Sequence, residues 1–268
     1  MKLDGRIALV TGASRGIGRG IAEALAAEGA AVAVNYRSGA DAANEVVQTI
    51  EAAGGRAVAI QGDVSEYPEA ERVVKETIEQ LGGLHVLVNN AGIARDKLIL
   101  HMEPEDWLDV MKVNFGGVFN CTKASMEHFM GERDGSIINI SSVMGQRGWL
   151  GESNYSASKG AVNAFTRCAA MEYARFGVRI NAVLPGFVPT ELVEGLVAKD
   201  GGQGILKQLP MRKFGDLQDV SGIVTFLATD DAKYMTGAQF TVDGGASAML
   251  GTGAPLPTPR PARTKGKA

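Results

Sequence analysis

The stretch Thr11-Gly12-Ala13-Ser14-Arg15-Gly16-Ile17-Gly18 (TGASRGIG, residues 11–18) follows an apolar run at 6–10 and opens a helical pattern at 16–28. Its three glycines allow a tight turn and let the backbone come close to a ligand. A helix that begins in such a turn presents free N–H groups, which bind phosphate. The spacing Gly-x3-Gly-x-Gly differs from the commonest dinucleotide motif, Gly-x-Gly-x-x-Gly. The stretch predicts a nucleotide-binding turn, with a purely structural strand–helix turn as the alternative.

Apolar segments of strand length alternate with helical patterns along the chain. The strand-like segments are 6–10, 31–35, 56–60, 85–88, 136–140, 178–183 and 239–242, and the helical patterns are 16–28, 40–53, 69–81, 105–130, 155–176 and 217–228. Because the strands are almost continuously apolar, both faces of their sheet must be covered, which is typical of a parallel sheet. We predict an α/β fold consisting of a single doubly wound Rossmann-type domain with a seven-stranded parallel sheet.

The end of the chain differs in composition from the rest. Residues 251–268 are basic, rich in Pro, Gly and Thr, and almost free of large apolar side chains, which predicts a disordered tail after a domain at 1–250. Four basic and no acidic residues follow Asp243, so the net charge of −3 becomes −7 when they are set aside. A body this acidic argues against nucleic-acid binding. A tail that contacts nucleic acid or another protein is the alternative.

The sequence also argues against a membrane protein, a secreted protein and a metal site. No apolar stretch approaches the roughly 20 residues of a membrane span, and the N-terminus does not resemble a signal peptide. We therefore expect no membrane association and a cytoplasmic location. The three histidines fit no metal-ligand spacing, so we predict no metal.

The end of the second strand predicts which dinucleotide is bound. An acid at this position grips the ribose 2′-hydroxyl of NAD, whereas an arginine favours the 2′-phosphate of NADP. Here the chain reads Asn35-Tyr36-Arg37-Ser38, with no acid before Asp41, and Arg15 in the glycine-rich turn can reach the same place. We predict NADP(H), with unpaired surface arginines as the alternative.

Two further strand ends carry polar or small residues. Asp63 and Val64 follow the third strand, where the carboxylate can accept from an adenine amino group and Val64 can cover the ring. Asn90, Ala91 and Gly92 follow the fourth strand. Ligands of open α/β sheets bind beside the carboxyl ends of the strands, so these residues are expected in one crevice.

A tyrosine and a lysine follow the fifth strand at the spacing of one helical turn. Tyr155 and Lys159 share a helix face, and Ser142 ends the strand before them. A phenol has a pKa of about 10, and a neighbouring ammonium lowers it towards the range useful for proton transfer. Ser142 can hold a carbonyl oxygen that Tyr155 protonates as a nicotinamide delivers hydride to the carbon. The three residues predict ketone reduction or its reverse.

Over residues 5 to 245 the chain resembles the classical short-chain dehydrogenase/reductase family. The motifs that carry the resemblance occur in one order: Thr11-Gly12…Gly16-Ile17-Gly18, Asn89-Asn90-Ala91-Gly92, Asn114, Ser142, Tyr155…Lys159 and Pro185-Gly186…Thr190. The resemblance implies a catalytic tetrad of Asn114, Ser142, Tyr155 and Lys159. In it Tyr155 is the acid or base, Ser142 binds the substrate oxygen, Lys159 binds the ribose and lowers the Tyr155 pKa, and Asn114 holds a water in a proton relay.

The family resemblance also implies the residues at the nicotinamide end of the cofactor. Pro185, Gly186 and Val188 are expected there, with Thr190 near the carboxamide or the phosphates. Members of the family usually form homotetramers through their two long helices, here 105–130 and 155–176. A non-catalytic nucleotide-binding scaffold would have lost part of the tetrad, and this sequence retains all of it.

Within the family, the segments GASRGIG, NNAGIARD, LPGFVPT and MTGAQFTVDGG are most similar to 3-oxoacyl-[acyl-carrier-protein] reductases of type II fatty-acid synthesis. This similarity implies an NADPH-dependent reductase of a 3-oxoacyl thioester, with acyl carrier protein as a candidate partner. Acetoacetyl-CoA reductases and alcohol or sugar dehydrogenases of the same family remain alternatives, because motifs specify the cofactor and the proton chemistry rather than the substrate.

Two segments, a loop at 143–154 and a Gly-containing lid at 188–209, are expected to select the substrate. Apolar side chains in and near them can line an acyl pocket or serve the core: Ile93, Trp149, Leu150, Phe187 and Leu192. Docking an acidic carrier protein needs positive charge near the cleft, and Arg133, Arg147 and Arg175 are the candidates. The acidic body argues mildly against a large basic docking face.

Overall fold

Seven parallel strands form one sheet in the order β3-β2-β1-β4-β5-β6-β7, as predicted. The computed structural model of the protein describes residues 1–191 and 201–248. The strands are β1 (Ile7–Val10), β2 (Ala31–Tyr36), β3 (Arg56–Gln61), β4 (Val86–Asn89), β5 (Gly135–Ile140), β6 (Val178–Pro185) and β7 (Gln239–Val242). The strand order reverses between β1 and β4, and at such a switch point the carboxyl ends of the strands leave a crevice.

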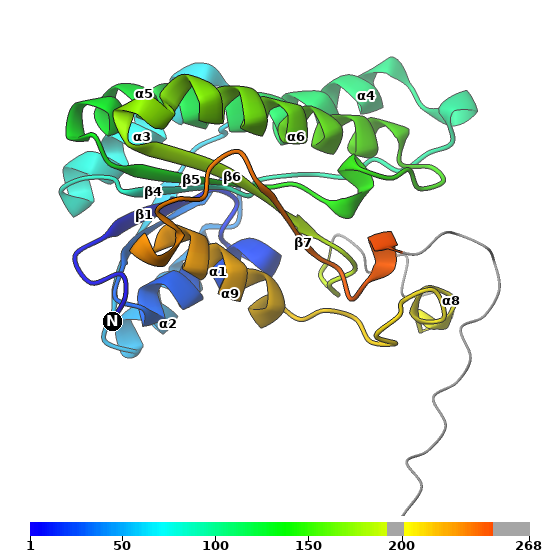
Figure 1. The fold of residues 1–268 in the computed structure, drawn as a ribbon, viewed down its shortest axis with the longest axis horizontal. Coiled ribbons are helices and arrows are strands. Elements are labelled where there is room, and N and C mark those ends of the chain that lie inside the picture. Colours follow the sequence, from blue (N-terminus) through cyan, green and yellow to red (C-terminus); the bar gives the residue numbers. More distant parts are fainter. Residues whose placement is uncertain (192–200, 249–268) are drawn as a thin grey trace, which may run out of the picture.

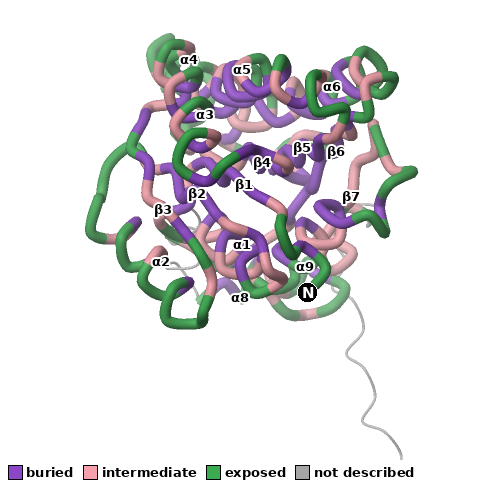
Figure 2. Tube along the Cα trace, turned by 90° about the vertical axis from the view of Figure 1, so that its left-hand side faces the viewer, coloured by how far each residue is buried: buried purple, intermediate pink, exposed green. Residues whose placement is uncertain are grey.

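Helices cover both faces of the sheet in a three-layer arrangement (Figure 1). One layer contains α1 (Gly16–Ala27), α2 (Ala40–Ala52) and α9 (Leu217–Ala228), and the other contains α3 (Tyr67–Leu81), α4 (Pro104–Met111), α5 (Gly117–Glu132) and α6 (Ser153–Tyr173). A short helix, α8 (Gln203–Leu206), follows residues 192–200. The strands lie in the buried middle layer, and the exposed residues gather on the outer sides of the helices (Figure 2).

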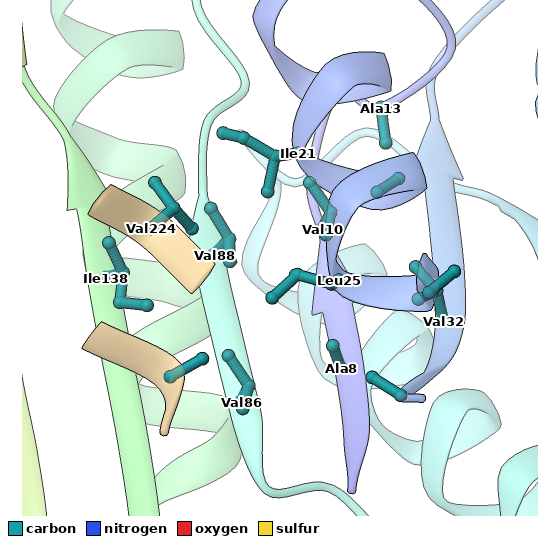
Figure 3. Close-up of a cluster of buried hydrophobic side chains, with 14 of the residues drawn as sticks. Ala8, Val10, Ala13, Ile21, Leu25, Val32, Val86, Val88, Ile138 and Val224 are labelled. Atoms are coloured by element: carbon teal, nitrogen blue, oxygen red, sulfur yellow. The ribbon is translucent and has the colours of Figure 1, made fainter. Parts of the chain in front are cut away.

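The hydrophobic core has two halves, one on each face of the sheet. Ala8 and Val10 of β1 belong to the half beneath α1 and α9, together with Ile21, Leu25 and Val224 (Figure 3). Ile7 and Leu9 alternate with them and belong to the half that packs against α3, α5 and α6. Because alternate residues of a strand point to opposite faces, only an uninterrupted apolar strand can serve both halves.

The helix predicted at 105–130 is present, with one local change inside it. Residues Lys112–Gly116 form a π-helical turn between α4 and α5. The turn contains Asn114, whose side chain is hydrogen-bonded to both the N–H and the carbonyl of Ile93. An inserted π turn accommodates one extra residue and redirects backbone groups, and such turns are frequent at functional sites.

Two predicted segments fall wholly or partly outside the described residues. The tail predicted at 251–268 lies outside them, and so does the middle of the lid predicted at 188–209. Of the helices in the parts of the chain that the structure describes, none combines the length and the apolar character required to cross a bilayer.

Candidate active site

A cleft of about 480 Å³ opens at the carboxyl edge of the sheet, beside the β1/β4 switch point. Every residue predicted to bind the cofactor lines it: Gly12, Ser14, Arg15, Gly16, Ile17, Gly18, Arg37, Asp63, Val64, Asn90, Ala91, Gly92, Tyr155, Lys159, Pro185, Gly186, Val188 and Thr190. Ser142 lines it as well, whereas Asn114 is fully buried behind it. The structure therefore brings together residues that are up to 178 positions apart in the sequence.

The glycine-rich turn packs so closely that side chains do not fit. A Cβ atom on Gly12, whose φ is +60°, would lie 2.9 Å from the Cα of Ala91. A Cβ on Gly18 would lie 2.4 Å from the carbonyl oxygen of Gly12. No side chain caps the N-terminus of α1, so its first N–H groups are available to an anion.

The hydroxyl of Thr11 joins this turn to the end of β4. Its Oγ1 accepts hydrogen bonds from the N–H groups of Asn90 and Ala91, at 2.9 and 3.0 Å. The Asn90 side chain in turn donates to the carbonyls of Thr11 and Gly12, at 2.9 and 3.1 Å. These bonds fix the two walls of the cleft relative to each other, and Thr11, which is buried and does not line the cleft, positions the turn.

Arg37 follows the end of β2, and Arg15 lines the same cleft from the glycine-rich turn. Asn35 is buried and donates to the carbonyls of Ile60 and Gly62, which closes this end of the cleft. Arg37 lies 3.9 Å from Asp63, and Arg15 is paired with Glu191 at 2.8 Å. Both guanidinium groups are mainly exposed, so these pairs are weak and open to competition by a phosphate.

Tyr155 and Lys159 lie one turn apart on α6, opposite the end of β5. The Lys159 ammonium is buried, lies 5.6 Å from the centre of the Tyr155 ring and donates to the carbonyl of Ile140 at 2.8 Å. Burial lowers the pKa of Lys159 to about 8. The Ser142 side chain is hydrogen-bonded to Tyr155 and accepts from the N–H of Met144 at 3.1 Å.

In the free protein, burial outweighs the lowering of the Tyr155 pKa that is expected from Lys159. Burial raises the pKa of Tyr155 well above its usual value, and the negative charge of Glu152 raises it further. The hydrogen bond from Ser142 opposes this shift and is outweighed. Burial therefore dominates the pKa of the phenol in the free protein.

Asn114 occupies the π-helical turn behind the cleft. Its Oδ1 accepts from the N–H of Ile93 at 2.8 Å, and its Nδ2 donates to Ile93 O at 3.0 Å and to Ser158 Oγ at 3.2 Å. Both side-chain N–H groups are thus engaged, and the π turn redirects backbone groups of this segment, which can offer a further contact to a proton relay.

Pro185 ends β6 and Gly186 follows it, on the far side of the cleft. A Cβ on Gly186 would lie 2.7 Å from the Cβ of Asp243, so the backbone passes directly beside β7. Thr190 lies over the glycine-rich turn, and its methyl would be 3.6 Å from a Cβ on Gly16. The segment after β6 therefore faces the N-terminus of α1 across the cleft.

The family model described as enoyl-(acyl carrier protein) reductase matches residues 12–247, a span that runs from the second residue of the glycine-rich motif past all the later motifs. The chain belongs to the short-chain dehydrogenase/reductase family. A 3-oxoacyl-[acyl-carrier-protein] reductase from Synechocystis is 47% identical over 244 residues, which cover 91% of this chain and 97% of the relative. A reductase of the same name from Staphylococcus aureus is 45% identical over 238 residues, covering 89% and 96%.

Solved structures of family members superpose closely on this one. A putative short-chain alcohol dehydrogenase from Sinorhizobium meliloti has a TM-score of 0.89 at 37% identity, covering 93% of this chain and 99% of that one. A gluconate 5-dehydrogenase from Burkholderia cenocepacia, in complex with NADP and tartrate, has a TM-score of 0.89 at 34% identity, covering 93% and 98%.

Of the apolar residues predicted to line an acyl pocket in this short-chain dehydrogenase/reductase, only some lie where they were expected. Ile93 lines the cleft, and the rings of Trp149 and Phe187 meet edge to face with centroids 5.4 Å apart. Leu150 is 85% exposed and does not line this cleft, and Leu192 lies outside the described residues.

The prediction that Arg133 and Arg175 lie near the cleft is wrong. Arg133 precedes β5 and donates to the carbonyl of Arg175, which precedes β6, so both lie at the amino edge of the sheet. Arg147 follows β5 and lies at the carboxyl edge, where it donates to the carbonyl of Ser247. Of the three candidates for docking an acidic partner, only Arg147 is at the correct edge.

Sequence reasoning missed several residues that shape the site of this family member. Thr11 and Asn35 fix the phosphate turn, and Asn154 ties α6 to the opposite wall by donating to the carbonyl of Arg95 at 3.0 Å. Each is a polar residue at the end of a strand or the start of a helix, the signal that was used for Asp63 and Asn90. Glu152 was missed too, although it lies only three residues before Tyr155.

Proposed function

We propose that this family member is an NADPH-dependent reductase that acts on 3-oxoacyl thioesters carried by acyl carrier protein. The observation that carries the proposal is the convergence of Tyr155, Ser142 and Lys159 on one end of a cleft whose other end holds an uncapped helix N-terminus and two arginines. The names of the relatives from Synechocystis and Staphylococcus aureus support the 3-oxoacyl substrate.

The residues of the cleft fit a dinucleotide. The close packing at Gly12 and Gly18 leaves bare backbone at the start of α1, where a pyrophosphate would be held. Arg15 and Arg37 would hold a 2′-phosphate in place of their present carboxylate partners, which favours NADP(H). Pro185, Gly186, Val188 and Thr190 would hold the nicotinamide end, and a bound NADPH supplies the hydride for the carbonyl carbon.

Tyr155 supplies the proton for the carbonyl oxygen. Its raised pKa keeps the phenol protonated at neutral pH, which is the form that reduction requires. Ser142, already hydrogen-bonded to Tyr155, holds the same carbonyl oxygen and orients it towards the phenol. As the oxygen gains negative charge, the phenolic proton moves to it and an alcohol results.

Lys159 and Asn114 restore the proton to Tyr155. With its pKa lowered to about 8, the Lys159 ammonium releases a proton more readily than an exposed lysine does. The backbone of Asn114, redirected by the π turn, can hold a water between Lys159 and the solvent. We infer that protons reach Tyr155 along this route.

An alcohol or sugar-acid dehydrogenase of the same family is the second candidate, favoured by the structural likeness to a gluconate 5-dehydrogenase. Acetoacetyl-CoA reduction is a third. We also infer a homotetramer, because Trp107, Leu108, Phe119 and Met171 expose apolar surface on α4, α5 and α6. We further propose a cytoplasmic location.

The mechanism is tested by Tyr155→Phe, which removes the acid and retains the ring. We expect NADPH binding, measured by nucleotide fluorescence, to stay within about twofold, and kcat to fall by roughly 10²–10⁴-fold. Retention of more than a tenth of the wild-type kcat would contradict the assignment of Tyr155.

A further inference from the structure

Gly145 ends the short 3-10 turn η3 (Val143–Gly145), which directly follows Ser142, and it packs against the backbone of α6. A Cβ atom on Gly145 would lie 2.7 Å from the carbonyl carbon of Lys159 and 2.8 Å from its oxygen. The same atom would lie 2.8 Å from Nδ2 of Asn163. Two of these three atoms belong to the main chain of a helix, so a change of rotamer cannot make room for a methyl group.

The requirement for glycine at this position is one of space. The φ of Gly145 lies outside the left-handed region, so other amino acids can adopt its backbone conformation. In the same loop, a Cβ on Gly148 would meet no atom within 4 Å, and one on Gly151 none closer than 3.9 Å. On α6, a Cβ on Gly160 would lie 3.4 Å from the carbonyl oxygen of Gly145. The main chains of the turn and of α6 therefore approach each other closely at Gly145.

Two hydrogen bonds within the turn link this contact to Ser142. The N–H of Gly145 donates to the carbonyl of Ser142 at 3.0 Å, and the N–H of Met144 donates to Ser142 Oγ at 3.1 Å. Because Oγ accepts the second bond, the hydroxyl proton of Ser142 can be donated to an oxygen in the cleft. The turn thus fixes both the backbone and the side chain of Ser142.

Ser141 holds the other side of Ser142 to the same point of α6. Its hydroxyl donates to the Lys159 carbonyl at 3.1 Å, and its N–H donates to the Val183 carbonyl at 2.8 Å. Residues on both sides of Ser142 therefore lie against the Lys159 peptide, one helical turn after Tyr155. The separation of the Ser142 and Tyr155 hydroxyls depends on how closely the turn approaches this peptide.

We propose that Gly145 is a positioning residue of the active site. Its lack of a side chain lets the turn after Ser142 pack directly on α6, which places the Ser142 hydroxyl beside that of Tyr155, where both can bind one carbonyl oxygen. The inference rests on the proposed function in one respect, that Ser142 holds the carbonyl oxygen. Gly145 does not line the cleft, so it acts on the reaction through Ser142.

Gly145→Ala adds one methyl group at this contact. The turn must retreat from α6 by roughly 0.8 Å for the 2.7 Å contact to reach an ordinary carbon–carbon separation of about 3.5 Å. A displacement of about 1 Å can cost roughly 10²-fold in rate, so kcat should fall by roughly 10–100-fold. Overpacking should also lower Tm by a few degrees. Kd for NADPH should stay within about twofold, because the phosphate-binding turn is unchanged.

Gly148→Ala is the matched control, because it adds the same methyl group to the same loop in open space. Its kcat and Kd should stay within about twofold of the wild type, with Tm unchanged. For every variant, kcat is calculated per NADPH-binding site counted by titration, so that unfolded protein does not register as lost activity.

A double-mutant cycle with Ser142→Ala separates positioning from a general structural role. Ser142→Ala alone should lower kcat roughly 10²–10³-fold. Adding Gly145→Ala to it should change kcat by no more than about twofold, while Tm still falls, because the group that Gly145 positions is already gone. A residue with only a structural role would lower kcat by the same factor in both backgrounds. That result would overturn the inference, and so would a Gly145→Ala protein that retains more than half of the wild-type kcat.

Ser141→Ala tests the same contact without added volume and replaces Gly145→Ala if the latter does not fold. It removes the hydrogen bond to the Lys159 carbonyl on the other side of Ser142. We expect kcat to fall roughly threefold to tenfold in the wild-type background and to change by less than about twofold in Ser142→Ala. Equal losses in both backgrounds, or no loss in either, would refute the proposed positioning.

The outcomes separate this inference from the proposed function when rates are measured with acetoacetyl-acyl carrier protein and with ethyl acetoacetate. If only the ester is reduced, the proposed substrate is wrong, and the cycle measured on the ester decides the role of Gly145. If Ser142→Ala retains the wild-type kcat, the proposed mechanism is wrong and the role of Gly145 fails with it. If Ser142→Ala loses activity and the cycle is additive, only the role of Gly145 is refuted. Failure of the wild type to reduce either ketone contradicts both.

Discussion

Replacing Gly18 by alanine tests whether close packing of the glycine-rich turn creates the phosphate site. An added methyl group would lie 2.4 Å from Gly12 O, 2.5 Å from Asn90 Nδ2 and 3.0 Å from the Cα of Ala13. Two of these atoms belong to the backbone, so a change of rotamer cannot relieve the overlap and the turn must open.

Two opposing contributions set the change in the free energy of unfolding of Gly18→Ala. Overpacking costs about 1–3 kcal/mol, and replacing a helical glycine by alanine returns up to about 1 kcal/mol. We expect a net loss of about 1–2 kcal/mol in the free energy of unfolding, or a fall in Tm of roughly 2–8 °C for a chain of this size. Opening the turn also displaces the N–H groups at the start of α1, so Kd for NADPH should rise at least tenfold.

Gly222→Ala is the matched control, because Gly222 lies in α9 with no atom within 4 Å of its added Cβ. It should raise Tm and leave Kd unchanged. Thermal unfolding followed by circular dichroism and titration with NADPH measure the two quantities. A Gly18→Ala protein as stable as Gly222→Ala, with an unchanged Kd, would refute the reasoning.

Three further predictions concern the cofactor, a buried charge and the assembly. Arg37→Ala should weaken NADPH binding roughly tenfold and leave NADH binding within twofold in parallel titrations, and an equal loss for both nucleotides would contradict the assigned 2′-phosphate contact. Lys159→Met should abolish turnover and yet raise the free energy of unfolding at pH 7 by up to about 3 kcal/mol. The Lys159 pKa is about 8 in the folded state and 10.5 in the unfolded state, so at pH 7 the buried ammonium destabilises the wild type. The wild type regains this stability as the pH rises from about 8 to 10.5. In urea unfolding, the difference in stability between Lys159→Met and the wild type should be smaller at pH 10 than at pH 7. An equal difference at both pH values would argue against a buried ammonium. Leu108→Glu, on the exposed apolar face of α4, should give a smaller species by light scattering, and an unchanged tetramer would place the interface elsewhere.

The sequence predicted the sheet and the cleft because both depend on local patterns. Uninterrupted apolar strands such as Ile7–Val10 indicate a sheet covered on both faces, and polar residues at strand ends indicate its carboxyl edge. The π turn at Lys112–Gly116 was missed because one inserted residue barely disturbs a helical pattern.

The state of the Tyr155 phenol could not be predicted in the same way. Spacing shows that Lys159 is a neighbour but says nothing of the desolvation that raises the phenol pKa. The error at Arg133 and Arg175 was avoidable, since each directly precedes a strand and so belongs to the amino edge. Glu152 could not be singled out from the sequence, because its pKa is raised by burial, which the residue type does not reveal.

The most direct test of the proposed function is steady-state NADPH oxidation by the wild type with acetoacetyl-acyl carrier protein, acetoacetyl-CoA, longer 3-oxoacyl thioesters, small ketones and sugar acids. We predict the highest kcat/KM for 3-oxoacyl chains on the carrier protein, with NADPH preferred to NADH. A higher kcat/KM for a sugar acid or a simple ketone, or a preference for NADH, would contradict it.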